Sequence, residues 1–142
     1  MKVQLFIPCF VDQLYGQTGM NTVKLLEKAG CEVSYNPKQT CCGQPAYNAG
    51  YLSEACDVSK KFIADFAGAD YIVSPSASCT GYLRNSLQEV FGKNTPEIES
   101  LEKRVFEISE FLVDVLDYTD FGASLNGVGT YHDACGALRE CG

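Results

Sequence analysis

Residues 3–35, VQLFIPCFVDQLYGQTGMNTVKLLEKAGCEVSY, decide the fold of this chain. The apolar run at 3–8 predicts a buried strand. Residues 17–29 have the spacing of an amphipathic helix that Gly30 stops, and residues 31–35 predict a second strand. A strand, a helix and a second strand in this order form the right-handed crossover that joins parallel strands. The segment therefore indicates a parallel sheet covered by helices.

The same alternation continues along the rest of the chain. We expect a third strand over 71–75 and a fourth over 127–133, with helices over 46–67, 78–91 and 98–116. This pattern is typical of a three-layer, Rossmann-like or flavodoxin-like α/β domain, in which a parallel sheet has helices on both faces. A chain of 142 residues, 46% of them apolar, has the size of one such domain.

Composition limits the compartment and the partners. Eight cysteines would indicate disulfides in a secreted chain, but Pro8 and Asp12 interrupt the N-terminal apolar run and no cleavage site follows. The sequence contains no stretch of about 18 apolar residues, so we expect no transmembrane segment. A net charge of −7 without a Lys/Arg cluster argues against nucleic acid as a partner. We expect a cytoplasmic protein whose ordered cysteines are metal ligands or redox groups.

Four cysteines follow the carboxyl ends of predicted strands. Cys9 follows the first strand, and Cys41 and Cys42 lie in the loop after the second. Cys79 lies in the first turn of the helix after the third strand. Open parallel sheets carry their sites at this edge, so we expect the four thiols to lie close together.

The residues around these cysteines support a site there. Gly43 can take a positive φ, so that the chain reverses and two adjacent cysteines both face inward. By contrast, Cys31 opens the second strand at the opposite edge, and Cys56 lies inside a helix, where packing is its expected role.

Neighbouring polar residues leave alternatives open. Ser74, Ser76 and Ser78 either donate hydrogen bonds to a sulfur site or cap the following helix. His132, beside Asp133 in the expected fourth strand, either makes an ordinary strand-end contact, or tunes a cluster or relays a proton.

Four sulfur ligands from separate loops suit a [4Fe–4S] cluster or a structural zinc ion. A third possibility is a thiol oxidoreductase in which Cys41 and Cys42 cycle through a vicinal disulfide. Zinc modules and redox dithiols usually carry CxxC pairs, which this chain lacks. The iron–sulfur interpretation is therefore favoured over a zinc-stabilised binding module or a vicinal-dithiol oxidoreductase.

The pattern C-x31-C-C-G-x35-C, in the contexts IPCF, TCCGQP and SPSASC, resembles the CCG (cysteine-rich domain) family of iron–sulfur proteins. Members include a component of heterodisulfide reductase, the iron–sulfur component of glycolate oxidase and proteins of lactate utilisation. The resemblance implies an electron-transfer component of hydroxy-acid oxidation, with L-lactate as the expected substrate of the system. It also implies partner subunits of a lactate or glycolate oxidation complex, and no turnover when this oxidoreductase component is alone.

The resemblance also bears on the ligands and on the domains. Some members end the motif with CxxC, and Ser76 stands at the first of those positions here, so a four-thiolate [4Fe–4S] cluster is implied in place of a noncubane one. Members usually hold two motifs, and GVGTYHDACG repeats the strand-then-cysteine start KVQLFIPCF. Residues 1–125 are then the first CCG domain, and residues 126–142 begin a second, truncated repeat with Cys135 as its first metal ligand. We expect little cluster in a chain exposed to air, because open thiolates oxidise.

Overall fold

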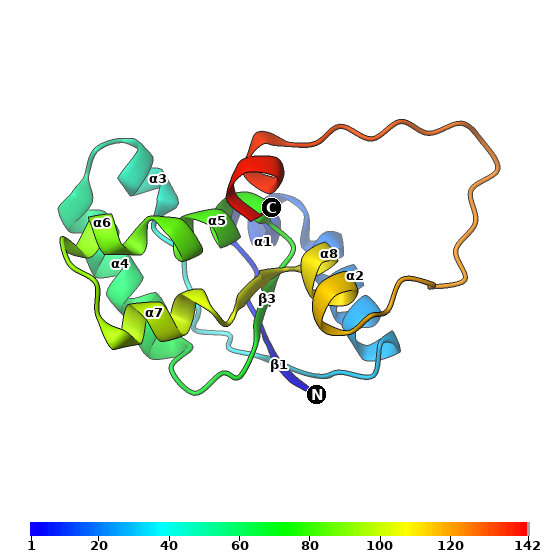
Figure 1. Cartoon of the computed structure of the whole chain (residues 1–142), viewed down its shortest axis with the longest axis horizontal. Helices are drawn as coiled ribbons and strands as arrows, with labels where there is room; N and C mark the ends of the chain where they lie inside the picture. The colour runs from blue at the N-terminus through cyan, green and yellow to red at the C-terminus, as the bar shows by residue number, and fades with distance from the viewer. Residues whose placement is uncertain (142) are drawn as a thin grey trace.

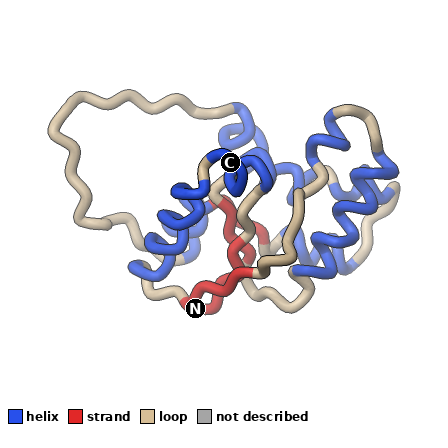
Figure 2. Tube along the Cα trace, turned by 180° about the vertical axis from the view of Figure 1, so that it is seen from behind, coloured by secondary structure: helices blue, strands red, loops and turns tan. Residues whose placement is uncertain are grey.

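The computed structural model describes residues 1–141, and four parallel strands form its centre. The strands are β1 (Lys2–Leu5), β2 (Glu32–Tyr35), β3 (Ile72–Ser74) and β4 (Val105–Glu107), hydrogen-bonded in the order β2-β1-β3-β4. This order is that of flavodoxin-like doubly wound sheets. Helices cover both faces of the sheet (Figure 1, Figure 2), so the structure confirms the predicted three-layer α/β fold.

The helices form two layers. One layer consists of α1 (Cys9–Leu14), α2 (Gly16–Lys28), α8 (Ile108–Glu110) and the π-helical turn η1 (Phe111–Val115). The other consists of α3 (Gln44–Asn48), α4 (Leu52–Asp65), α5 (Ala77–Asn85), α6 (Leu87–Phe91) and α7 (Pro96–Glu102). A last turn, η2 (Ala137–Cys141), lies against α5. No helix within residues 1–141 has the length and apolar content needed to cross a bilayer.

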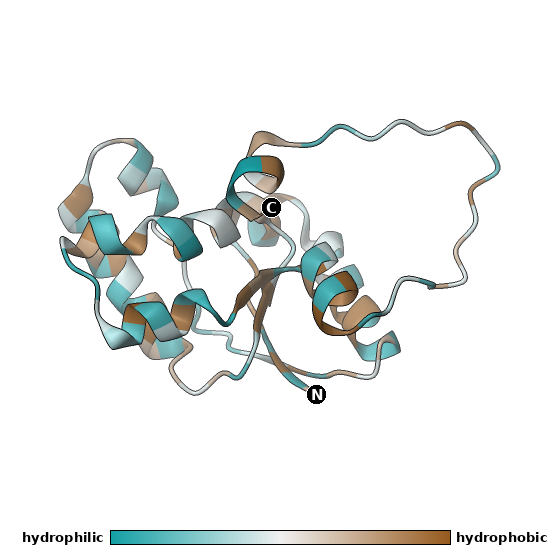
Figure 3. Ribbon diagram, in the orientation of Figure 1, coloured by the Kyte–Doolittle hydropathy of each residue, from teal (hydrophilic) through white to brown (hydrophobic). Residues whose placement is uncertain are grey.

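Strand alternation divides the core into two apolar clusters. Leu5 packs into the cluster with α2 and η1, whereas Phe6 packs into the cluster with α4 to α7. Phe6 meets Phe62 edge to face, with ring centroids 4.9 Å apart. The strands are accordingly the most apolar part of the molecule's centre (Figure 3). Burial on both faces explains why β3 appears in the sequence as a short apolar run, whereas the edge strand β2 is mostly exposed.

Two helices predicted as continuous are broken. The helix expected over 46–67 is α3 followed by α4, because Gly50 takes a φ of +83° between them. The helix expected over 78–91 is α5 followed by α6, with the break at Ser86. The breaks let successive short helices follow the twisted face of the sheet.

The prediction of the fourth strand was wrong. The helix expected over 98–116 is α7, and β4 then pairs with β3 before α8 begins. The apolar residues at helical spacing in this region are also compatible with a three-residue strand. The strand forms because β3 has a free edge with which residues 105–107 can pair. Residues 127–133 form no strand; they lie in an exposed segment that runs away from the domain body (Figure 1). Gly127 and Gly129 weaken strand formation there.

Candidate functional site

The carboxyl ends of the first three strands lead to four cysteines. Cys9 is the first residue of α1, Cys41 and Cys42 lie in the loop between β2 and α3, and Cys79 is in the first turn of α5. The sulfur atoms of Cys9 and Cys41 lie 3.6 Å apart. The Cys42 side chain is the largest influence on the pKa values of both Cys41 and Cys79, so the four thiols form one connected group. All eight cysteines of the chain are free thiols.

The four thiols differ in exposure. Cys42 is only 1% exposed, in the apolar cluster between the sheet and α4 to α7. Cys41 and Cys79 are partly buried, and Cys9 is exposed. The site therefore has one side anchored in the core and one side, at Cys9, open to solvent.

Gly43 makes the tight turn that lets both adjacent cysteines take part. Its φ is +104°, as expected for a chain reversal at this position, and its N–H lies 3.5 Å from the Cys41 sulfur. A Cβ atom at Gly43 would lie 3.0 Å from the Tyr82 hydroxyl oxygen and 3.1 Å from Ser59 Oγ. Both the backbone conformation and the surrounding space thus require glycine.

Two buried hydroxyl groups, from α4 and α5, hold the turn at Cys42 and Gly43 in place. Ser59 Oγ lies 3.4 Å from the carbonyl oxygen of Cys42 and 3.0 Å from the hydroxyl oxygen of Tyr82. A carbonyl only accepts, so Ser59 donates its single proton to Cys42, and Tyr82 must then donate to Ser59. The chain of donors runs in one direction, from α5 through α4 to the cysteine pair.

This direction predicts unequal effects of two substitutions. Ser59→Ala removes the donor to the Cys42 carbonyl and the partner of the Tyr82 hydroxyl, and we expect the free energy of unfolding to fall by about 2–3 kcal/mol. Tyr82→Phe removes only one donor from Ser59, and we expect a loss of about 1 kcal/mol. Urea denaturation measures both, with Ser53→Ala on the exposed side of α4 as the control. Equal losses in the Ser59 and Tyr82 variants would contradict the assigned direction.

Hydrogen bonding among the thiols separates their pKa values. The Cys42 thiol donates to Cys41, which lowers the pKa of Cys41 to about 5, and the Gly43 N–H acts in the same direction. The Cys42 thiol likewise lowers the pKa of Cys79. The pKa of Cys42 is raised, first by these bonds and then by burial. Burial also raises the pKa of Cys9. The site thus favours thiolates at Cys41 and Cys79, and thiolates are the form that binds metals.

The serines beside Cys79 act on its sulfur. Ser76 is the N-cap residue that precedes α5, but its side chain makes no capping bond, and its Oγ lies 3.4 Å from that of Ser78. Hydrogen bonds from both hydroxyls help lower the pKa of Cys79. Capping is therefore not the role of Ser76. Ser74 Oγ and Thr80 Oγ1 are buried without a hydrogen-bond partner in the part of the chain that the structure describes.

The remaining cysteines lie elsewhere. Cys31 is buried in the cluster beneath α2, at the amino end of β2, and Cys56 packs from α4 against the cluster that contains Cys42. Cys135 is exposed and lines a cavity of about 410 Å³ together with Ser78 and Arg139. The turn η2 holds this segment on α5, since Asn85 Nδ2 donates to the Glu140 carbonyl oxygen at 2.9 Å. His132 is exposed in the coil before this turn, not at the end of a strand.

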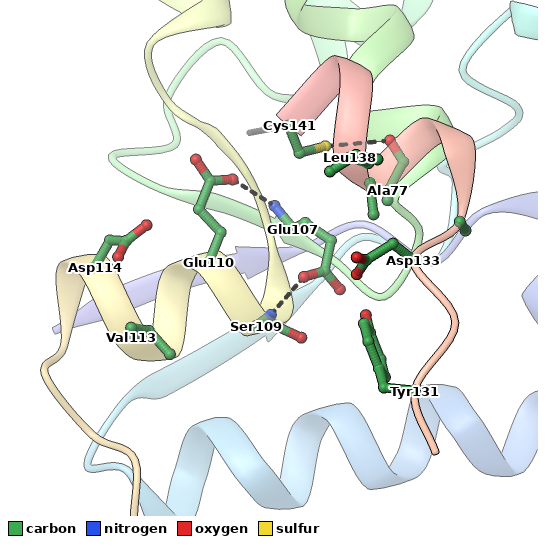
Figure 4. A pocket seen from close by; sticks show the side chains of 12 residues that line it. Ala77, Glu107, Ser109, Glu110, Val113, Asp114, Tyr131, Asp133, Leu138 and Cys141 are labelled. Atoms are coloured by element: carbon green, nitrogen blue, oxygen red, sulfur yellow. Dashed lines mark hydrogen bonds between the residues drawn. The ribbon is translucent and has the colours of Figure 1, made fainter.

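A cavity of about 470 Å³ lies beneath the C-terminal turn, and Figure 4 shows the side chains around it. Its walls include the carboxylates of Glu107, Asp114 and Asp133, and the thiol of Cys141, which donates to the Ala77 carbonyl oxygen at 3.4 Å. None of the four clustered cysteines lines it. Its acidic walls disfavour an anionic ligand.

The clustered cysteines fit a sulfur-ligated group by their chemistry. Four thiols meet at one edge, two of them with lowered pKa values, and the buried Nε2 of Gln39 has no hydrogen-bond partner within residues 1–141. As the side chains lie, no three His, Cys, Asp or Glu residues among residues 1–141 converge on the position of a single metal ion. In a four-iron cluster each thiolate binds a different iron atom, so the ligands need not converge on one position.

Sequence reasoning missed the roles of Gln39, Ser59 and Tyr82. Gln39 stands two residues before Cys41, which was a weak signal. Ser59 and Tyr82 belong to no motif, and their pairing appears only when α4 and α5 pack together.

Known proteins share the segment that contains the four clustered cysteines. Residues 3–84 match the family model CCG, described as a cysteine-rich domain. The whole chain is 47% identical to a lactate utilization protein A of Geobacillus kaustophilus (strain HTA426) and 45% identical to that of Geobacillus thermodenitrificans (strain NG80-2), and it covers 60% of each. It is 45% identical to the protein of the same name from Oceanobacillus iheyensis and covers 59% of it. The chain thus spans about 60% of the length of these relatives. No solved structure matches it.

Proposed function

Since the chain belongs to the CCG family of cysteine-rich domains, we propose that it is an iron–sulfur electron-transfer component of an L-lactate oxidation system. The observation that carries the proposal is the connected group of Cys9, Cys41, Cys42 and Cys79 at the carboxyl edge of the sheet. The names of the relatives support lactate as the substrate of the system.

In this proposal the four cysteines are the ligands of a [4Fe–4S] cluster, which accepts and releases single electrons. The turn at Gly43 and the Ser59 hydroxyl orient Cys42, and the apolar cluster around it keeps water from that side. Cys9 is on the exposed side, where a partner can approach. Electrons would therefore enter and leave at the Cys9 side of the site.

We assign oxidation of the hydroxy acid to partner subunits of a lactate or glycolate oxidation complex. The large cavity in Figure 4 has carboxylates from Glu107, Asp114 and Asp133 on its walls, and these repel the carboxylate of a hydroxy acid. The four clustered thiols suit electron transfer, which needs a partner to supply the electrons.

The proposal includes a second repeat that begins at about residue 126. Cys135 follows the segment GVGTYHD as Cys9 follows the first strand, and this makes it a candidate metal ligand. Three apolar side chains of the neighbouring coil, Leu125, Val128 and Tyr131, are exposed. They are the side chains that a further sheet would bury.

Metal and sulfide analysis of anaerobically prepared protein tests the proposal. We expect a brown protein with about four iron atoms and four sulfides per cluster, and an electron paramagnetic resonance signal after reduction. Bound zinc without iron would instead support a zinc-stabilised module. A colourless, metal-free protein with a Cys41–Cys42 disulfide would support a dithiol oxidoreductase.

A further inference from the structure

The side-chain amide of Gln39 is held in one orientation. Its Oε1 accepts a hydrogen bond from the main-chain N–H of Ile7 at 3.0 Å, just beyond the end of β1. A main-chain N–H needs an acceptor, so the oxygen of the amide must face Ile7 and the nitrogen must face away. The loop before the cysteine pair is thereby tied to the first strand.

The nitrogen of this amide lacks a partner. Gln39 Nε2 is buried, and within residues 1–141 nothing accepts its hydrogen bonds. Buried donors are nearly always paired in folded proteins, because an unpaired donor has lost its water without replacement. The observation points to an acceptor that belongs beside Gln39 in the functional protein.

The surroundings of Gln39 indicate which acceptor this is. Gln39 lines a cavity of about 330 Å³ whose wall also contains Cys9 and Cys41, the two cysteines whose sulfurs are 3.6 Å apart. A second glutamine on the same wall, Gln13, already donates to the Asp12 carboxylate at 2.8 Å. Gln13 is exposed, so water can accept from its second N–H, whereas the buried Nε2 of Gln39 has neither a protein acceptor within residues 1–141 nor contact with solvent.

We propose that Gln39 donates a hydrogen bond to a sulfur atom of the cluster on the side held by Cys9 and Cys41. The inference rests on the proposed function, since it assigns a residue toward the same cluster. A donor stabilises the reduced cluster more than the oxidised one, because reduction adds one electron and makes the sulfurs more negative. No proton is transferred. Gln39 thus raises the reduction potential of the cluster.

Redox titration of two matched variants tests this role. In Gln39→Met we expect the ratio of reduced to oxidised cluster at a fixed solution potential to fall by about tenfold, the effect of one hydrogen bond to a charged group. Tenfold corresponds to 59 mV for a one-electron couple. Gln13→Met changes the same residue type on the same cavity wall, and it should leave the potential unchanged.

Pulsed electron paramagnetic resonance gives a second test, in which the unsubstituted protein is compared with the same two variants. With ¹⁵N in the glutamine side chains, the reduced cluster should show a nitrogen coupling, which Gln39→Met abolishes and Gln13→Met retains. Iron-containing protein without such a coupling, or with the same potential in Gln39→Met, overturns the role of Gln39 and leaves the proposed function standing. Absence of iron from the unsubstituted protein overturns the proposed function itself.

Discussion

Replacement of Cys42 by serine is expected to reduce the iron content of anaerobically prepared protein to background. Cys42 is the most buried of the four clustered cysteines, and its side chain lowers the pKa values of both Cys41 and Cys79. A serine hydroxyl has a similar size but is a poor ligand for iron in a sulfur-rich site. The expected result is therefore loss of metal from a chain that keeps its sheet, measured by iron analysis and circular dichroism.

Cys56→Ser is the matched control for this experiment. Cys56 packs against the same apolar cluster as Cys42, but from the middle of α4 and outside the connected group of thiols. We expect its iron content to equal that of the unsubstituted protein. Equal loss of iron from both variants would mean that any change in this cluster destabilises the site, and it would remove the support for Cys42 as a ligand.

Gly43→Ala is expected to lower the free energy of unfolding by about 2–4 kcal/mol and to abolish iron binding. The left-handed backbone at φ +104° costs a residue with a Cβ about 1 kcal/mol. Overpacking against the Tyr82 hydroxyl and Ser59 Oγ adds about 1–3 kcal/mol, because both atoms are buried and hydrogen-bonded to each other. Urea denaturation measures the first effect, and iron analysis measures the second.

Gly50→Ala is the control that separates the cost of the left-handed backbone from the cost of overpacking. Gly50 also has a positive φ, +83°, but a Cβ there would have no atom within 4 Å. We expect it to lose only about 1 kcal/mol and to keep its iron. If Gly43→Ala proved no more harmful than Gly50→Ala, the tight space around the cysteine pair would have no role in shaping the site.

Most of the sheet could be predicted from the sequence because its strands are marked locally. The runs that became β1 and β3 are mostly apolar, and β2 follows Gly30, which ends the preceding helix; these signals need no knowledge of distant residues. The strand β4 could not be found in this way. Its three residues lie within an apolar stripe that fits a helix equally well, and only the free edge of β3 makes the extended form favourable.

The sequence by itself determined the alternation of strands and helices, and with it the positions of Cys9, Cys41, Cys42 and Cys79 after three strands that run in the same direction. Parallel strands bring their carboxyl ends to one edge whatever their side chains are, so topology was enough. That these cysteines hold a cluster stays a prediction.

Only the tertiary structure decided how that edge is built. The contact between the Cys9 and Cys41 sulfurs, the hydrogen bond from Ile7 to Gln39 and the pairing of Ser59 with Tyr82 join residues that are 32, 32 and 23 positions apart. Such partners depend on how loops and helices pack over the sheet, to within a fraction of an ångström, and periodicity does not contain that information. Hydrogen-bond direction and burial, which set the thiol pKa values, therefore came from the fold alone.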